Sequence, residues 1–439
     1  MKKIQLFTLL VLLASVIPSS AASWVVSYGQ SLQAAISNAA AGDNITVMSG
    51  TYNENIAFGK GLTIQGSGGA VLVTGTLIVT NATLPVYISD IQFGRDGNSG
   101  IAINNCQSAR MDRCSLVGGG DFNGSSNVFY CYKNTFSGSV NINLCTLTMQ
   151  RCNVAGNLNS SNSTTKFIAS VIAGRINHSA GEITVFQSTL NGDPNVFNFN
   201  PTDKAWICYN FISYRTEVRS GNLQFVGNRV WPNPNNIGWN ILFLGSGGVA
   251  TVRNNIFGRN WHANGWAIAV NSDAGPVSII NNTAFETYNF IRVYGSPGGV
   301  QIRGNIHWKS GDSGGWSVYT DTSQTIVDHN NFCAGINQGV QTGTINQNPE
   351  LINLGYWNFN CFNLSPSSPC INTGPTVDAT FINFDGTTNT MGAYGGHSYD
   401  PTGLTTTNPV VLSGSVTPLY VKKGQAVTVS ARAAVVAAP

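Results

Sequence analysis

The chain has 439 residues, only 9% of which are charged, and its formal net charge is +3. Without a Lys/Arg cluster, this near-neutral balance gives no electrostatic footprint for nucleic acid or for an anionic membrane, so neither partner is expected. The low charge predicts a large core under a surface that is mostly uncharged and polar.

The N-terminus is typical of an export signal. Lys2 and Lys3 precede an apolar run over residues 6–17, and the small residues at 19–22 suit a signal peptidase. We expect cleavage of residues 1–22 after Ala22, and a secreted or cell-surface protein. An uncleaved anchor is the alternative, but the run is short for a membrane span of about 20 residues. No membrane span is expected after signal cleavage.

The next segment, residues 23–60, predicts an N-terminal cap and the first strands. Within it, SLQAAISNAAAGD begins at Ser31, which can cap the N-terminus of a helix. Leu32 and Ile36 share one helical face, and Gly42 can end the helix. A short helix at this place would cover an exposed strand edge at the end of the fold.

A recurring phrase runs through residues 61–335: one apolar residue, two variable ones, an anchor that is often Asn, and an apolar pair, as in VRNNIF at 252–257. Successive anchors lie 18 to 27 residues apart, a period that indicates a solenoid. Between them lie short β-branched runs split by Gly, Asn and Ser. Because stacked turns of this kind enclose a continuous core, the repeat predicts an all-β fold, a single-stranded parallel β-helix.

The anchors have a predicted structural role. At a tight corner, Asn tolerates left-handed backbone geometry, and its amide can hydrogen-bond to the equivalent side chain one rung away. Ser and Cys are small enough to share this position. The anchors that are not Asn are Gly66, Asp90, Cys114, Cys152, Ser170 and Ser188. The structural ladder is predicted at Asn134, Asn210, Asn228, Asn255, Asn282, Asn305 and Asn330.

Nine Cys in an exported chain suggest disulfides, although the number is odd and the spacing irregular. Cys361 with Cys370, or Cys333 with Cys361, are the plausible bridges. Cys114 and Cys152 are expected instead to be buried small residues, two rungs apart and too distant to bond. No CxxC pair and no Cys/His group with zinc spacing occurs, so neither a metal nor another cofactor is indicated.

Six of the nine Trp lie between positions 231 and 316, on the longest rungs. Insertions in a solenoid tend to collect on the binding face, and flat aromatic rings suit stacking against sugars. We predict carbohydrate-binding roles for four of them, Trp239, Trp261, Trp266 and Trp316. The alternative is that wide rungs need bulky core fillers, and this is favoured for Trp231 and Trp308, which share one offset from their anchors.

The same region holds the ionisable residues that catalysis would need. The candidates are Arg259, His262, Glu286, Arg292 and His307. In a polysaccharide lyase, Arg would neutralise a uronate, and His, Arg or Tyr would take the proton from C5. In a glycosidase, two carboxylates would be needed, and Glu286 has only Asp273 or Asp312 nearby in sequence. A solvated surface role is the alternative for each candidate. Arg303 and Asp328, at one offset on consecutive rungs, predict a cross-rung ion pair.

The C-terminal part has two sections. Residues 336–398, where the repeat fades, are expected to close the end of the solenoid. Residues 399–439 begin with a Thr/Pro linker and continue with the alternation of a partial β-sandwich, too short for a complete one.

Two segments carry a family resemblance. The stretch SLQAAISNAAAGDNITVMSGTYNENIAFGKGLTIQG and the C-terminal NPELINLGYWNFNCFNLSPSSPCINTG resemble the opening and the closing segments of secreted bacterial parallel β-helix proteins of the pectin-lyase-like superfamily. The resemblance covers Ser23 to Gly396 and implies a right-handed β-helix. It is weak for chemistry, because the superfamily holds lyases, hydrolases, esterases, epimerases and proteins without known catalysis.

Enzyme signatures of the superfamily are incomplete in this chain. GTYNE at 50–54 is similar to the first motif of pectin methylesterases, but their paired Asp segments have no counterpart. Polygalacturonase-like enzymes need several clustered Asp and a GHG segment, whereas here Gly395, Gly396 and His397 lead into Ser398. No Asp cluster of the pectate-lyase type is present, so calcium is implied by the resemblance alone.

These observations predict a secreted or cell-surface β-helix protein with extracellular polysaccharide as its partner. Lyase-type cleavage of an acidic glycan is one hypothesis. A non-catalytic adhesin or structural surface rod is the other. The sequence does not predict the oligomeric state.

Overall fold

The structure is a computed structural model. It describes residues 21–396 and two strands of the tail, β43 (Val410–Thr417) and β44 (Thr428–Ala434), which pair antiparallel. The gaps within 21–396 are 95–99, 194, 201, 220, 232–239, 246, 261–263, 296, 309–314, 355–360, 378–380, 382 and 384–386. The predicted signal peptide lies outside the described residues, except for its last two positions.

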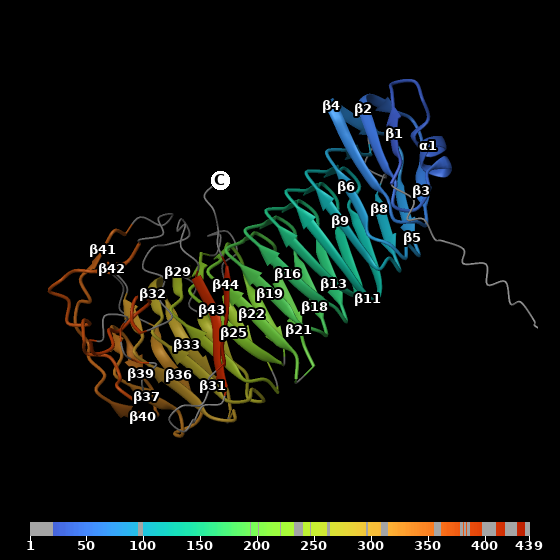
Figure 1. The fold of residues 1–439 in the computed structure, drawn as a ribbon. Helices are drawn as coiled ribbons and strands as arrows, with labels where there is room; N and C mark the ends of the chain where they lie inside the picture. Colours follow the sequence, from blue (N-terminus) through green and yellow to red (C-terminus); the bar gives the residue numbers. More distant parts are fainter. Residues whose placement is uncertain are drawn as a thin grey trace, which may run out of the picture.

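One parallel sheet system of 40 strands winds into a solenoid of about 14 turns. Figure 1 shows it as a rod whose turns stack along one axis. Most turns contribute one strand to each of three flat sides, which we call faces 1, 2 and 3 in chain order. The predicted parallel β-helix is therefore confirmed.

Face 1 holds the strands that lead into the anchors. They are β1 (Ser23–Val26), the first parts of β2 (Asn44–Tyr52) and β4 (Thr63–Val73), β6 (Val86–Ser89), β9 (Ser108–Asp112), the second halves of β11 (Gly120–Tyr132) and β13 (Val140–Gln150), β16 (Thr164–Ile168), β19 (Ile183–Phe186), β22 (Lys204–Cys208), β25 (Asn222–Val226), β28 (Ala250–Arg253), β31 (Val277–Ile280), β34 (Val300–Arg303), β37 (Ile326–Asp328) and β40 (Val340–Thr342). The last residues of β2 and β4 continue onto face 2, where β4 pairs with β7.

Face 2 holds short strands that follow the anchors. They are β7 (Gln92–Phe93), β10 (Ser115–Leu116), β12 (Thr135–Phe136), β14 (Asn153–Val154), β17 (Val171–Ile172), β20 (Thr189–Leu190), β23 (Phe211–Ile212), β26 (Arg229–Val230), β29 (Ile256–Asn260), β32 (Thr283–Thr287), β35 (Ile306–Trp308) and β38 (Asn331–Phe332).

Face 3 completes each turn. Its strands are β3 (Ile56–Phe58), β5 (Leu77–Thr80), β8 (Ile101–Asn104), the first halves of β11 and β13, β15 (Leu158–Ser161), β18 (Ile176–Ser179), β21 (Asn195–Asn198), β24 (Thr216–Arg219), β27 (Leu242–Leu244), β30 (Trp266–Val270), β33 (Asn289–Val293), β36 (Trp316–Thr320) and β39 (Gly335–Ile336).

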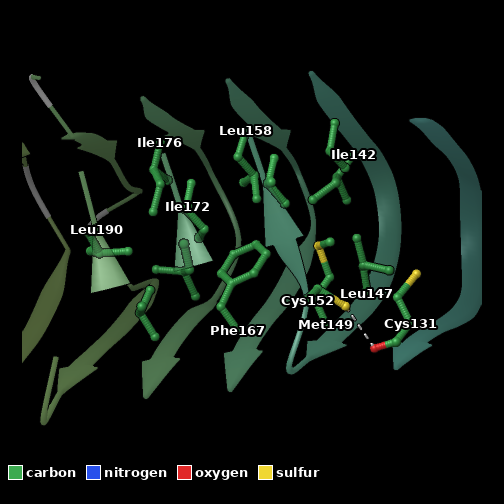
Figure 2. Close-up of a cluster of buried hydrophobic side chains, with 14 of the residues drawn as sticks. Cys131, Ile142, Leu147, Met149, Cys152, Leu158, Phe167, Ile172, Ile176 and Leu190 are labelled. Atoms are coloured by element: carbon green, nitrogen blue, oxygen red, sulfur yellow. Dashed lines mark hydrogen bonds between the residues drawn. The ribbon is translucent and has the colours of Figure 1, made fainter. Parts of the chain in front are cut away.

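The core follows from the two-residue alternation of the strands, which sends every second side chain inward. The first apolar residue of the repeated phrase forms one continuous inward column, and Figure 2 shows part of it between the faces. In this column Cys131, Met149 and Phe167 lie on successive rungs of face 1, in register, and each is 0–1% exposed. Stacked identical positions therefore form one cluster along the rod.

The anchors form a buried hydrogen-bonded column, which we call the Asn ladder. The Oδ1 of Asn255 accepts from the backbone N–H of Asn228 (2.8 Å) and from its Nδ2 (3.0 Å). Its own Nδ2 donates to the carbonyl oxygen of Phe225 (2.8 Å) and to Asn282 Oδ1 (2.9 Å). The same pattern continues through Asn305 to Asn330.

Where Ser replaces Asn in this column, the hydroxyl takes over the acceptor role. The backbone N–H of Cys152 donates to Ser170 Oγ, and that of Ser170 donates to Ser188 Oγ, each at 3.1 Å.

The predicted left-handed geometry belongs to a different residue, so that part of the prediction was wrong. It is the residue before each anchor from Cys114 onward that has positive φ, as at Arg113 (+52°), Arg151 (+55°) and Asn254 (+55°). Asp90 (+60°) falls in this column too, and it was assigned one residue too early. Gly66, which the register of β4 and β6 aligns with Asp90, was likewise assigned one residue too early. The register pairs Gln92 with Ser115, which makes Ile91 the equivalent of Cys114. The apolar Ile91 explains why the pattern was hard to place there.

One short helix, α1 (Leu32–Asn38), lies near the N-terminal end of the rod. Ser31 caps it by accepting from the backbone N–H of Ala34 (3.0 Å), and Leu32 and Ile36 are buried. The helix ends at Asn38, four residues before Gly42, which holds a left-handed φ of +94° in the turn that follows.

The segment after the last rungs packs along the flank of the rod. It contains the antiparallel pair β41 (Leu351–Ile352) and β42 (Asn363–Leu364). The ring of Phe362 stacks on Trp231 at 6.0 Å between centroids, and Asn254 Nδ2 donates to the carbonyl oxygens of Ala393 and Gly395.

None of the nine Cys forms a disulfide bond, so the predicted bridge, Cys361 with Cys370 or Cys333 with Cys361, was wrong in either form. Cys361 lies in a cluster with Phe285, whereas Cys370 lies in another with Ile306. Cys370 Sγ instead accepts a hydrogen bond from Asn331 Nδ2 (3.0 Å). Cys114 and Cys152 are each 2% exposed, as expected for small core residues. Within the described part of the chain, none of the helices has the length and apolar character needed to cross a bilayer.

Candidate functional site

Several predicted site residues fall outside what the structure describes. Trp239, Trp261 and His262 lie in the gaps, as does Asp312. Arg259 belongs to strand β29 of face 2, but its side chain is not among those described. The remaining candidates can be placed.

His307 lies inside the solenoid and is 0% exposed. Its Nδ1 is 2.9 Å from Ser317 Oγ, its Nε2 is 3.1 Å from the carbonyl oxygen of Thr287, and its ring lies against Phe290. These contacts connect face 2 to face 3 across the core. His307 is therefore a structural residue that no polysaccharide can reach.

The carboxylates considered for glycosidase chemistry lie at different corners of the coil. Glu286 is half-buried near the end of β32, at the corner between faces 2 and 3. Asp273 is exposed in the turn that leads from face 3 to face 1, where it accepts from Ser272 Oγ. A paired acid and base is therefore not formed by these two residues.

Two of the predicted aromatic residues come together on face 3. We call the group formed by Trp266, Arg292, Tyr294, Trp316 and Tyr319 the aromatic cluster. It is built on β30, β33 and β36, and the register places Arg292 directly beside Tyr319. The Tyr319 ring lies 5.1 Å from Trp316, edge to face, and 6.4 Å from Trp266.

The guanidinium of Arg292 holds the rings of this cluster in place. The guanidinium carbon of Arg292 lies 4.4 Å from the ring centroids of both Tyr294 and Tyr319. The same guanidinium pairs with Asp321 at 2.9 Å, and Asp321 also accepts from the backbone N–H of Gly295. The side chain of Arg292 is 15% exposed. Its charge is therefore already matched, and its position between two rings is fixed by several contacts.

The exposure of the cluster leaves aromatic surface in contact with solvent. Trp316 is 37% exposed, and Trp266 and Tyr319 are half-buried. The backbone N–H of Trp316 donates to Asn289 Oδ1 (3.0 Å), which holds the start of β36 to the neighbouring rung. The arrangement can offer flat apolar rings and hydrogen-bonding edges to a ligand.

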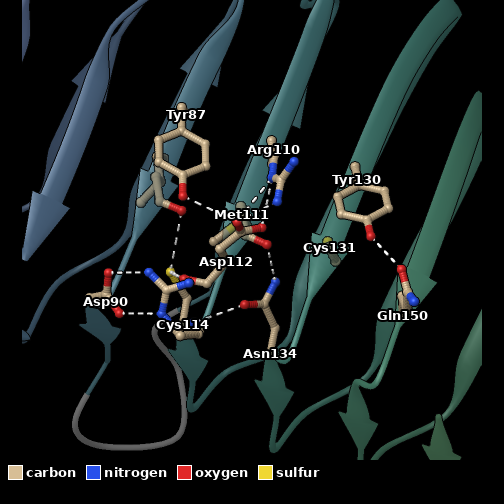
Figure 3. Close-up of polar contacts among 12 residues, drawn as sticks. Tyr87, Asp90, Arg110, Met111, Asp112, Cys114, Tyr130, Cys131, Asn134 and Gln150 are labelled. Carbon is tan, nitrogen blue, oxygen red and sulfur yellow. Dashed lines mark hydrogen bonds and ion pairs between the residues drawn. The ribbon is translucent and has the colours of Figure 1, made fainter. Parts of the chain in front are cut away.

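A second cation–aromatic group, on face 1, was not predicted. Figure 3 shows Arg110 between the rings of Tyr87 and Tyr130, at 5.8 and 5.0 Å from their centroids. Arg110 also pairs with the buried Asp112 (2.7 Å), to which the Tyr87 hydroxyl donates. Tyr87, Arg110 and Tyr130 share one offset from the anchor column, so the repeat in the sequence could have identified this group.

Charged side chains near the anchors are paired across rungs. Arg113 contacts Asp90 at 2.6 Å, and its guanidinium lowers the pKa of that carboxyl. The predicted pair of Arg303 and Asp328 is present at 3.9 Å. In each pair, the two residues lie at equivalent positions on consecutive turns, so the ion pair contributes to the stacking of those turns.

The Trp predicted as core fillers lie under the C-terminal segment. Trp231 packs with Phe285 and Phe362, and Trp308 contacts the same group. Across the described residues, no three His, Cys, Asp or Glu side chains gather in a group that would hold a metal ion.

Comparisons with known proteins do not assign the chain to a family. No protein-family model matches the chain, and no curated protein matches it. Among solved structures, pectate lyase Pel9A is similar at 15% identity with a TM-score of 0.30, over 86% of this chain and 97% of that one. Similarity at this level says nothing about the chemistry of the site.

Proposed function

We propose that the protein is exported and binds an extracellular polysaccharide through the aromatic cluster on face 3. The observation that carries the proposal is the exposed Trp316 beside Tyr319, with Trp266 two rungs away on the same face. Sugar rings present flat C–H surfaces and hydroxyl edges, which suit partly exposed aromatic rings.

The fixed geometry of the cluster favours binding. Arg292 holds Tyr294 and Tyr319 on its two sides, so these rings lose little conformational freedom when a ligand arrives. Because Arg292 is paired with Asp321, its charge is not open to a uronate carboxylate. These contacts support binding more than lyase-type cleavage of an acidic glycan.

The test is a binding screen of the purified protein against soluble polysaccharides, with the wild type, Trp316→Ala and Tyr319→Ala. Losing a stacking ring should weaken binding about 5- to 30-fold, equivalent to about 1–2 kcal/mol. Tyr28→Ala is the control, because Tyr28 is 73% exposed at the N-terminal end of the rod. Equal binding by all four proteins would refute the site.

The same screen separates binding from cleavage. A rise in ultraviolet absorbance from unsaturated uronates would establish a lyase, which the contacts of Arg292 and His307 do not favour. If no polysaccharide binds or reacts across a broad panel, the proposal fails and a structural rod is the better account.

A further inference from the structure

A shallow groove lies on face 3 on the N-terminal side of the aromatic cluster. Its volume is about 550 Å³, and it crosses strands β13, β15, β18, β21 and β24. Figure 1 shows β13, β18 and β21 in this order along the rod, and β15 pairs between β13 and β18. The outward residues of the lining are mostly amides and hydroxyls, namely Asn141, Asn143, Asn159, Ser161, Asn177 and Ser179. We call it the amide groove.

One column of the groove is ordered by its own hydrogen bonds. Asn141 Nδ2 donates to Asp121 Oδ1 (2.6 Å), Asn159 Nδ2 to Asn141 Oδ1 (2.8 Å), and Asn177 Nδ2 to Asn159 Oδ1 (2.9 Å). The Asp121 carboxylate can only accept, so it sets the direction of all three amides. The register places these residues on consecutive rungs, about 4.8 Å apart.

A second column runs beside the first. The register aligns Asn143, Ser161 and Ser179, and Ser161 Oγ donates to Asn143 Oδ1 (2.9 Å). Residues two apart on a strand lie about 6.6 Å from each other, so the two columns form a regular polar grid. The first column ends where Val196 follows Asn177 and cannot hydrogen-bond, whereas the second continues from Ser179 to Asn198.

The grid keeps hydrogen-bonding capacity toward solvent. An Asn amide has two N–H groups and two acceptor lone pairs, and the column uses one N–H and one lone pair of Asn141 and of Asn159. Each therefore retains a donor and an acceptor in fixed positions. A hydroxyl is both a donor and an acceptor, which makes a polyhydroxylated chain the complementary ligand.

The lining between the ends of the groove carries no charge. Asp121 stands at one end, and at the other Arg219 pairs with Glu217 at 2.8 Å. His178, in the lining, is 1% exposed, and burial lowers the pKa of its imidazole, so it is neutral at pH 7. A charged ligand would lose water here without gaining an ionic partner.

We infer that the amide groove is a second binding site, for an uncharged and hydroxyl-rich glycan that lies along the rod axis. The inference rests on the proposed function, because it assigns the same ligand class to a separate site on the same face. It also sets the charge of the ligand, in place of the acidic glycan expected from the lyase hypothesis.

The experiment compares a soluble neutral β-glucan with polygalacturonate, by titration calorimetry on the folded protein. Asn159→Ala removes the middle amide of the column and should weaken β-glucan binding about 3- to 10-fold. Asn153→Ala is the matched control, because Asn153 is an exposed Asn on face 2 of a neighbouring rung, and it should change nothing. Raising the salt from about 0.05 M to about 0.5 M should leave binding unchanged.

Each outcome decides between the site and the wider function. Tighter, salt-sensitive binding of polygalacturonate would overturn the neutral ligand while leaving polysaccharide binding in place. If Trp316→Ala weakens β-glucan binding and Asn159→Ala does not, the amide groove is not a site. If the wild type binds neither polymer, the inference fails. The broad panel of polysaccharides then tests whether the aromatic cluster alone binds a ligand. Circular dichroism of Asn159→Ala confirms that the variant is folded.

Discussion

Replacing Asn255 by Ala tests whether the Asn ladder holds neighbouring turns together. Asn255 is 0% exposed, and its side chain makes four hydrogen bonds, two as acceptor from Asn228 and two as donor to Phe225 and Asn282. At about 1 kcal/mol for each buried bond, Asn255→Ala should lower the free energy of unfolding by about 4 kcal/mol. Asn255→Ser should lower it by about 2–3 kcal/mol, because a hydroxyl can still accept from the backbone N–H of the preceding anchor.

Urea denaturation measures the two losses, and hydrogen exchange locates them. The Asn228 amide proton, which loses its acceptor in Asn255→Ala, should exchange faster there than in Asn255→Ser. Because turns of a solenoid are coupled mainly to their neighbours, protection near the N-terminal end should change less. A cost below about 1 kcal/mol for Asn255→Ala, or equal costs for the two variants, would refute the reasoning.

Three further predictions concern the thiols, the C-terminal segment and acid. Burial raises the pKa of Cys152 to about 12, so its thiol should resist alkylation at pH 8 and react only after denaturation; mass spectrometry of the labelled peptide measures this. Phe362→Ala should remove the stack on Trp231 and speed limited proteolysis after about residue 345 relative to the solenoid. The lowered pKa of Asp90 makes its pairing with Arg113 stabilise the fold above about pH 4, an effect lost as pH falls through the folded pKa; Arg113→Met should therefore show a smaller drop in melting temperature between pH 6 and pH 3 than the wild type.

The architecture could be predicted from the sequence because every turn of the solenoid buries an apolar residue at the same position of the repeat. The apolar residue three places before Asn255 is Val252, which is 0% exposed, and the equivalent Phe225 and Ile279 are 0% exposed too. The repeat did not predict which residue at each corner has a positive φ. The positive φ lies one residue before the anchor, where the chain uses Arg, Lys, Ala or Gln as well as Asn and Gly, so the residue type carried no clear signal.

The binding surfaces were recoverable to different degrees. Asn141, Asn159 and Asn177 each stand eleven residues before an anchor, so the offset that identifies the core would also have identified the amide column. In the aromatic cluster, Trp266 and Trp316 also share an offset, eleven residues after Asn255 and Asn305. Arg292 and Tyr319 stand ten and fourteen residues after their anchors, so the offset identifies the two Trp but not the rest of the cluster. The spacing of Cys361 and Cys370 in the sequence could not show that they do not form a disulfide, because the packing of the C-terminal segment separates them in space.

The distribution of rung lengths connects the two candidate surfaces. From Asn134 to Ser188 each step is 18 residues, so outward columns stay aligned and form a flat polar grid. The steps from Asn228 onward are 23 to 27 residues long, and there face 3 presents rings in place of amides. The register carries one column of side chains from Asn141 through Asn159, Asn177 and later rungs to Arg292 and Tyr319. Within it, Ala269 is covered by its neighbours (0% exposed). Eight steps of about 4.8 Å make this column about 38 Å long. A single polymer chain lying along the column would therefore contact hydrogen-bonding groups at one end and stacking rings at the other. Trp316→Ala and Asn159→Ala should then weaken binding of a long glycan more than their separate effects on short oligosaccharides predict, because the two contacts are linked through one ligand.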